Sequence, residues 1–288
     1  MKHVVIALAV LAAACGPSPD TDLPPLTGLG VPLSGEPCAY SQDIPPSIVA
    51  SVAAQFQDSP VEPPPAVTPE DRAAYQALVE RQRTEDWANL CRFRMANGEM
   101  WIAGAQTTVV FMGDSITQLW AFADPDVFSA GNRNRGISGQ TTPQMLVRFR
   151  ADVVDLKPAA VHILAGVNDI AGNTGPTTLT AVTNNIQSMV EIAKANGIAV
   201  ILATPLPADR FNWQPGQKPA EAVAALAAWV RRYAAEQNLV LADYYPVLAT
   251  PEGALKPELG PDGVHPNKAG YALMKPILEA AIAEALRR

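Results

Sequence analysis

Short apolar runs alternate with longer helical patterns over residues 107–286, and this alternation leaves few possible folds. Runs such as AAVHILAG and IAVILATP are apolar at nearly every position, which is typical of strands buried on both faces. Strands that alternate with helices predict a parallel sheet with right-handed crossovers. The expected strands are residues 107–112, 131–135, 159–164, 198–203 and 239–242. The expected helices are about 115–121, 142–156, 177–196, 219–237 and 267–286.

The first fifteen residues are expected to form a lipoprotein signal peptide. Lys2 precedes an apolar stretch, residues 4–14, that is too short to span a bilayer. The AAAC sequence that ends at Cys15 resembles a bacterial lipobox, in which the cysteine becomes lipid-modified and is the first mature residue. The usual leucine of that motif is replaced by Ala12. The alternative is a plain secretory signal with an incidental cysteine.

Export would place the protein in an oxidising compartment. Gly16 stands where an aspartate would signal retention in the inner membrane, so we expect attachment to the outer membrane, facing the periplasm or the cell surface. A soluble periplasmic or secreted protein is the alternative. With Cys15 used for lipidation, Cys38 and Cys91 remain, and they form either one disulfide or two unpaired thiols.

Residues 16–67 are expected to be a largely disordered tether. Repeated prolines fix φ and remove backbone donors, so this segment cannot supply a core element, although residues 47–57 could form one short helix. The folded domain is expected over 68–288. It begins with a helical segment, 68–98, in which Thr68 is the N-cap and Asn97-Gly98 the C-cap. This segment is expected to be one or two helices laid against the sheet.

Charge and composition exclude several classes of function. Apolar residues make up 48% of the chain and charged residues 17%, which is enough apolar material for a large core. The formal net charge of −7 argues against nucleic acid as a partner and gives no attraction to anionic lipid headgroups. No apolar stretch after the N-terminus is long enough to span a membrane, so the lipid anchor is the only expected membrane contact.

Polar residues follow the predicted strands at the positions where ligands bind in open parallel sheets. The first strand ends in GDS at Ser115, and the second is followed by Gly136 in NRGISGQTT. The third is followed by Asn168 in GVND, and DGVH places Asp262 and His265 just before the last helix. We therefore expect these residues to converge at one edge of the sheet.

These four motifs resemble the sequence blocks of the SGNH hydrolases, also called GDSL-type esterases and lipases. The order and spacing match over 107–286, with Ile116 in place of the usual leucine. The sequences GDSITQLW and NRGISGQTT are similar to those of the branch with platelet-activating-factor acetylhydrolase-like and thioesterase I-like enzymes. With the strand pattern, the resemblance implies a three-layer α/β/α, flavodoxin-like fold whose five-stranded parallel sheet has the order 2-1-3-4-5.

The resemblance implies a Ser-His-Asp triad, and the residues support it. Ser115 is the implied nucleophile, and a serine hydroxyl needs a base. Of the three histidines, His3 leaves with the signal peptide and His162 lies in an apolar strand, which leaves His265. Asp262, three residues before it, can hold the imidazole in the required tautomer. The alternative interpretation of Asp262 is a helix entry that only pairs with backbone amides.

The resemblance also implies an oxyanion hole made by the backbone N–H groups of Ser115 and Gly136 and the side-chain amide of Asn168. A side chain at Gly136 would obstruct the approach of the carbonyl, although an ordinary turn glycine is the alternative. Asn168 could instead cap a turn. Three further aspartates near the strand ends are expected to be structural, namely Asp114, Asp169 and Asp243.

The predicted activity is hydrolysis of carboxylic esters through an acyl-enzyme, with short acyl groups such as acetyl on carbohydrate as the expected substrates. A lysophospholipase or thioesterase of the same family is the alternative, and a non-catalytic glycan- or lipid-binding lipoprotein a third. No cofactor or metal is expected, because the chain lacks the Walker lysine and keeps a single available histidine. The sequence leaves the oligomeric state open.

Substrate specificity is expected in the loops at about 120–130, 170–176 and 205–218. Phe211 and Trp213 in the last loop could line an acyl or sugar site, or could pack on their own domain. Trp120 is expected in the core.

Overall fold

The computed structural model describes residues 38–40, 42–57 and 63–288. The chain divides into two compact units, residues 1–41 and 42–288, and the second carries every element given below. The predicted signal peptide, Cys15 and most of the predicted tether lie outside the described residues. Cys38 and Cys91 are each disulfide-bonded rather than free thiols.

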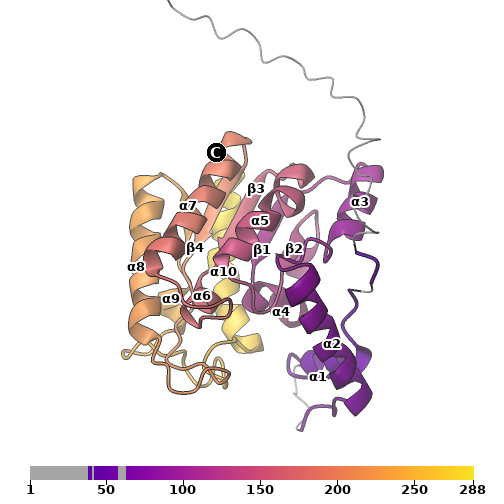
Figure 1. Cartoon of the computed structure of the whole chain (residues 1–288). Coiled ribbons are helices and arrows are strands. Elements are labelled where there is room, and N and C mark those ends of the chain that lie inside the picture. The colour runs from indigo at the N-terminus through magenta and orange to yellow at the C-terminus, as the bar shows by residue number, and fades with distance from the viewer. Residues whose placement is uncertain (1–37, 41, 58–62) are drawn as a thin grey trace, which may run out of the picture. The chain divides into compact units, whose positions relative to one another are not determined.

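Five parallel strands form a single sheet with the order β2-β1-β3-β4-β5, which confirms the predicted fold (Figure 1). The register pairs the last residue of β1, Gly113, with Gly136 of β2 and Leu164 of β3, so three strands end at the same level. The strands are β1 Val109–Gly113, β2 Arg133–Gly136, β3 Ala160–Leu164, β4 Ala199–Ala203 and β5 Val240–Ala242.

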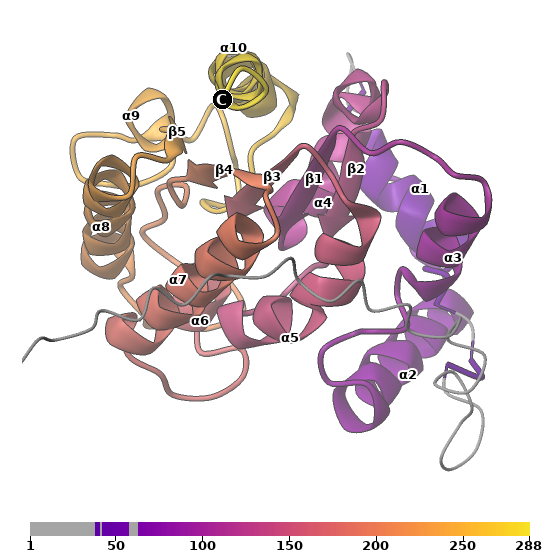
Figure 2. The same ribbon diagram turned by 90° about the horizontal axis from the view of Figure 1, so that it is seen from above.

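Helices cover both faces of the sheet. Figure 2 shows α5 and α7 on one side and α10 on the other. The two layers follow from the alternation of side chains along each strand, since Val109 and Phe111 join a core with α4 and α10, whereas Val110 and Met112 join a core with α5, α7 and α8. The helices are α4 Ser115–Ala123, α5 Thr142–Asp152, α6 Val167–Ile170, α7 Leu179–Ala195, α8 Ala220–Glu236, α9 Tyr245–Leu248 and α10 Lys268–Ala285. Two short 3₁₀ turns are η1 Pro125–Phe128 and η2 Val154–Leu156.

Two aromatic residues behave as expected. Trp120 is fully buried and packs against the ring of Tyr271, 5.3 Å away. His162 is also fully buried, with its Nε2 3.0 Å from the Tyr244 hydroxyl. Burial lowers the pKa of His162 to about 3, so this imidazole is neutral and serves as a core residue.

Three helices precede the sheet and lie beyond its β2 edge in both ribbon views (Figures 1 and 2). They are α1 Pro46–Ala54, α2 Pro69–Glu85 and α3 Arg94–Ile102. Thr68 caps α2 as predicted, because its hydroxyl accepts a hydrogen bond from the Asp71 N–H at 3.1 Å. The predicted C-cap at Asn97-Gly98 was wrong, since α3 runs through both residues.

The helical segment expected over 68–98 forms two helices, because residues 86–93 form turns between α2 and α3. The carboxylate of Asp86 accepts hydrogen bonds from the Leu90 and Cys91 N–H groups at 2.8 and 2.9 Å, and these bonds stabilise the turns in place of a helix.

The expected short helix in the proline-rich segment is present as α1, yet it does not belong to a free tether. Phe56, just after α1, is buried in the core, with its ring 6.1 Å from that of Tyr271 and 6.4 Å from that of Phe122. Residues 42–57 therefore belong to the folded unit. Within the described ranges, none of the helices has the length and apolar character needed to cross a membrane.

Candidate active site

Ser115 occupies the first position of α4, directly after the turn that ends β1. Asp114 is the N-cap, and its carboxylate accepts the N–H of Ile116 at 2.9 Å. Gly113 is required for the tight turn, because a Cβ there would lie 2.0 Å from Oγ1 of Thr117. No described residue accepts a hydrogen bond from the Ser115 N–H. This leaves a backbone donor beside the hydroxyl, at the positive end of a helix.

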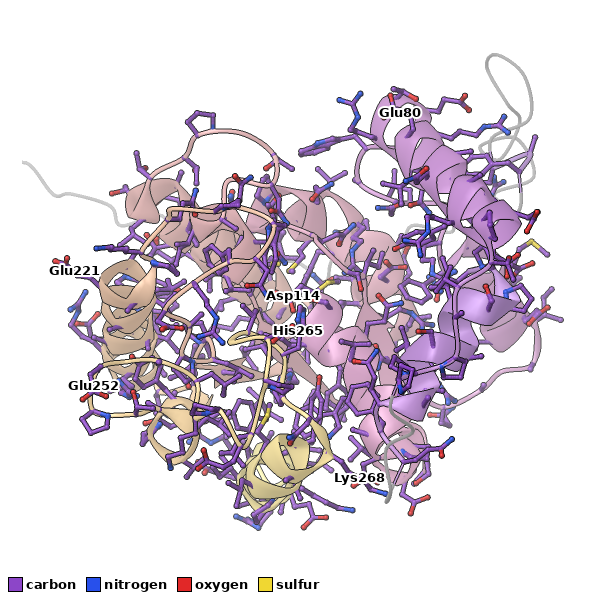
Figure 3. All side chains as sticks on the ribbon, turned by 90° about the horizontal axis from the view of Figure 1, so that it is seen from below. Glu80, Asp114, Glu221, Glu252, His265 and Lys268 are labelled. Carbon is purple, nitrogen blue, oxygen red and sulfur yellow. The ribbon has the colours of Figure 1, made fainter. Side chains whose placement is uncertain are left out.

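His265 bridges Ser115 and Asp262. Its Nε2 lies 2.8 Å from the Ser115 hydroxyl, and its Nδ1 lies 2.6 Å from one oxygen of Asp262. The other Asp262 oxygen accepts the N–H groups of Val264 and His265 at 2.9 and 2.8 Å. Figure 3 shows His265 close to Asp114 in the middle of the molecule. Residues 150 positions apart thus form the arrangement expected of a Ser-His-Asp triad.

The two carboxylates of this region have opposite pKa shifts. Burial by itself would raise the pKa of Asp262, but the hydrogen bond and charge of His265, with the two backbone N–H groups, lower it to about 2. Burial raises the pKa of Asp114 to about 6, against the lowering effects of the Ile116 N–H and of His265. At neutral pH Asp262 is therefore fully ionised, whereas the pKa of Asp114 lies close to the pH.

The second predicted oxyanion donor, Gly136, is already committed elsewhere. Its N–H donates to Oδ1 of Asn134 at 2.8 Å, and a Cβ on this glycine would lie 2.3 Å from the Gln118 nitrogen. Its role as an oxyanion donor therefore stays a prediction, and the glycine allows close packing of β2 against α4. Gly139, the other glycine of NRGISGQTT, has a φ of +78°, and no described residue accepts a hydrogen bond from its N–H.

Asn168 is 3% exposed and sits in α6, at the end of β3. Its Nδ2 donates to Asp114 Oδ2 at 3.2 Å and to the Gln140 carbonyl at 3.0 Å, and its Oδ1 accepts from Asn173 at 2.9 Å. Both amide hydrogens thus have protein acceptors, so Asn168 reaches an oxyanion only by giving up one of these bonds. Its role as an oxyanion donor stays a prediction.

The remaining aspartates have structural partners, as expected. Asp169 accepts the N–H and hydroxyl of Thr142 at 2.9 and 2.6 Å, which ties α6 to the start of α5. Asp243 forms an ion pair with Arg231 at 2.8 Å. Among the described residues, no group of three His, Cys, Asp or Glu side chains is placed to hold a metal ion.

The two loop aromatics have different roles. Phe211 is 2% exposed and belongs to the core, whereas Trp213 is 42% exposed. The indole ring lies 6.3 Å from the His265 ring, and its N–H donates to Oδ1 of Asn173 at 3.0 Å. Asn173, which sequence reasoning missed, also donates to the carbonyl of Gly139 at 3.0 Å. Only Trp213 therefore lies beside the candidate site.

A hollow of about 310 Å³ is lined in part by His265 and Asp262. It is bounded by α1 and by the loop that carries Asp262, and most of its other lining residues are apolar. These include Val52, Phe56, Pro64, Leu119 and Pro266.

Comparisons with known proteins identify the family of the chain. The model of the GDSL-like lipase/acylhydrolase family matches residues 111–273. A candidate acylhydrolase from Bacteroides fragilis is 45% identical, with a TM-score of 0.67 over 70% of this chain and 99% of that one. A GDSL-like lipase from Bacteroides thetaiotaomicron is 41% identical, also with a TM-score of 0.67, over 70% and 100%.

A more distant solved structure is Axe2, an acetylxylan esterase from Geobacillus stearothermophilus. It is 25% identical, with a TM-score of 0.50 over 61% of this chain and 94% of that one. No curated protein matches the chain. The family match spans more than half of the sequence and includes Ser115, Asn168 and His265. On these grounds the chain is an ester hydrolase that belongs to the GDSL-like lipase/acylhydrolase family.

Proposed function

We propose that the protein hydrolyses carboxylic esters through an acyl-enzyme formed on Ser115. The observation that carries this proposal is the pair of short contacts of His265, 2.8 Å to Ser115 and 2.6 Å to Asp262. The Ser115 oxygen attacks the ester carbonyl while Nε2 of His265 takes its proton. When the tetrahedral intermediate collapses, the carbon–oxygen bond to the alcohol breaks and the same proton goes to the leaving oxygen. Water then repeats the steps and releases the acid.

The developing oxyanion needs donors that are in place before the reaction. We infer that the N–H groups of Ser115 and Gly139 supply two of them, because neither has an acceptor among the described residues. Asn168 is the third donor, after one of its hydrogens leaves Asp114 or the Gln140 carbonyl. This assignment replaces Gly136 by Gly139 and keeps the other two predicted residues.

The proposed substrates are short acyl esters, such as acetyl groups on carbohydrate. The acetylxylan esterase among the similar structures supports this choice, as does the exposed indole of Trp213 near His265. The apolar hollow beside His265 favours a second candidate, an esterase for longer acyl chains such as those of lysophospholipids or thioesters. Hydrolysis rates along a series of p-nitrophenyl esters from acetate to dodecanoate distinguish the two.

The proposal is tested by release of acetate from p-nitrophenyl acetate and from acetylated xylan. We expect Ser115→Ala to lower kcat by on the order of 10⁴-fold or more with an unchanged melting temperature. Ser188→Ala, a change on α7 at a serine whose hydroxyl donates to the Asn184 carbonyl of the same helix, is the matched control and is expected to keep the activity. Near-normal turnover by Ser115→Ala contradicts the assignment.

We further propose that the enzyme is an exported lipoprotein held at the outer membrane through Cys15. The support is the lipobox-like sequence described above. Cys15→Ser is expected to move the activity from the membrane fraction to the soluble fraction, and activity that stays with the membranes contradicts the anchor.

A further inference from the structure

An open cleft of about 690 Å³ lies between α2 and the loops that follow β2 and β3. One wall carries Tyr75, Gln82 and Trp87, and the opposite wall carries Gly139 and Asn173. The first wall comes from residues that precede 111, where the match to the family model begins. We call this hollow the α2 cleft. It is separate from the apolar hollow beside His265.

The α2 wall is fixed to the catalytic unit by hydrogen bonds at its C-terminal end. Gln144 donates to the Trp87 carbonyl at 2.6 Å, and Gln140 donates to the Ala88 carbonyl at 3.0 Å. None of the 17 residues of α2, all of them described, is buried. A helix that is held in place without burying a face leaves that face accessible to a ligand.

The side chains that line the α2 cleft suit a ligand with many hydroxyl groups. Eight of the lining residues carry carboxamides, which both donate and accept hydrogen bonds, although Gln140, Gln144 and Asn173 already bind protein groups. None of the described lining residues is an aspartate or a glutamate. The two lining arginines are engaged, Arg83 with Glu80 and Arg92 with a backbone carbonyl. The carboxamides are those of Gln42, Gln82, Asn89, Gln118, Gln140, Gln144, Asn173 and Gln214.

Two of these carboxamides have polar atoms without a partner. Asn89 is 8% exposed, and its Oδ1 is buried with no hydrogen-bond donor among the described residues. Nε2 of Gln42 is likewise buried without an acceptor in the described part of the chain. A buried polar atom that lacks a partner is costly, and a hydroxyl can both donate to Asn89 and accept from Gln42. Beside them, Trp87 is 42% exposed and offers an apolar ring face.

We propose that the α2 cleft binds the uncharged sugar residues of an acetylated oligosaccharide while its ester lies at Ser115. The cleft adjoins the candidate active site, because Asn173 lines it and hydrogen-bonds both Asn168 and Trp213. Trp87 stacks on one sugar ring and Asn89 accepts from a sugar hydroxyl. This inference rests on the proposed ester hydrolase function and adds a binding site for the alcohol part of the substrate.

Kinetics on two substrates test the proposal. Trp87→Ala and Asn89→Ala are each expected to lower kcat/KM on acetylated xylo-oligosaccharides by about tenfold, mainly through KM, because each removes a contact with the sugar. Hydrolysis of p-nitrophenyl acetate, which is too small to reach the cleft, is expected to change less than about twofold. Trp101→Ala, on an indole that is 80% exposed on α3 outside the cleft, is the matched control and is expected to change neither rate.

A binding experiment keeps the inference separate from the proposed function. The Ser115→Ala protein cannot cleave the ester, so the acetylated ligand stays intact during a titration. This variant and the double variant Ser115→Ala/Trp87→Ala are each titrated calorimetrically with acetylated xylo-oligosaccharides. Gln82→Ala in the same background is a second cleft variant in case Trp87→Ala does not fold. We expect weaker binding for both combined variants, and equal binding overturns the cleft assignment even if the esterase is active. If the wild type hydrolyses neither ester, the proposed function fails, and the titration still decides whether the cleft binds glycans.

Discussion

Replacing Asp262 by asparagine separates the orienting role of this carboxylate from its backbone contacts. The asparagine oxygen can still accept the N–H groups of Val264 and His265, so the loop is expected to keep its shape. Its amide nitrogen, however, would face Nδ1 of His265, which lies 2.6 Å from the carboxylate oxygen. The imidazole must then carry its proton on Nε2, only 2.8 Å from the Ser115 hydroxyl, and cannot take a second one.

The expected loss has two parts. The pKa of Asp262 falls from 3.8 to about 2, which corresponds to about 2.5 kcal/mol. The side chain is 40% exposed, so solvent screening reduces this to about 1 kcal/mol, or about fivefold in rate. The wrong tautomer adds more, since the same change in a buried serine-protease triad costs about 10⁴-fold. We expect a loss of about 10³-fold in kcat for Asp262→Asn.

Steady-state hydrolysis of p-nitrophenyl acetate at pH 7–8 measures this loss. Asp155→Asn, a change at an exposed surface aspartate paired only loosely with Arg150 at 3.9 Å, is the control and is expected to retain full activity. A loss smaller than about tenfold, in Asp262→Asn protein with a normal melting temperature, refutes the reasoning. The imidazole would then be oriented by something other than this carboxylate.

Three further predictions follow from the geometry. Gly136→Ala is expected to lower the melting temperature by roughly 5 °C, because the added Cβ meets the Gln118 backbone at 2.3 Å; an unchanged melting temperature contradicts this close packing. Asn168→Ala is expected to lower kcat about 10²-fold or more on p-nitrophenyl acetate if its amide serves the oxyanion, and unaltered kcat excludes that role. The pKa of Asp114 is raised to about 6, so the folded state binds its proton more tightly than the unfolded state between pH 4 and 6. Stability relative to Asp114→Asn should therefore fall by about 2.4 kcal/mol from pH 4 to pH 7 in denaturant titrations, and a constant difference contradicts the raised pKa.

The sheet could be predicted from the sequence because its strands are buried on both faces. Runs such as Val109–Met112 and Ala160–Leu164 are buried at every position, as expected of strands that are covered on both faces. The convergence of Ser115 and His265 could also be predicted from the sequence, since each motif lies at the end of a strand or before a helix. Parallel strands bring such positions to one edge without any knowledge of side-chain contacts.

The errors lie where a side chain competes with the regular backbone pattern. The carboxylate of Asp86 binds two N–H groups and turns the chain where a helical spacing was expected. In NRGISGQTT two glycines stand three residues apart, and the choice between Gly136 and Gly139 depends on strand register and on the side chain of Asn134. Phe56 likewise docks α1 on the core from within a proline-rich segment, because one aromatic residue finds an apolar site there.

Asn173 shows how the sequence motifs depend on a residue that none of them includes. Its amide nitrogen donates to Asn168 and to the Gly139 carbonyl, and its oxygen accepts from Trp213. One side chain thus joins the ends of two strands to the loop that lies beside His265. Because Asn173 also lines the α2 cleft, a ligand there contacts a residue that orients two of the three proposed oxyanion donors. A sugar bound far from the ester can therefore influence the reacting carbonyl through a single hydrogen-bonded residue.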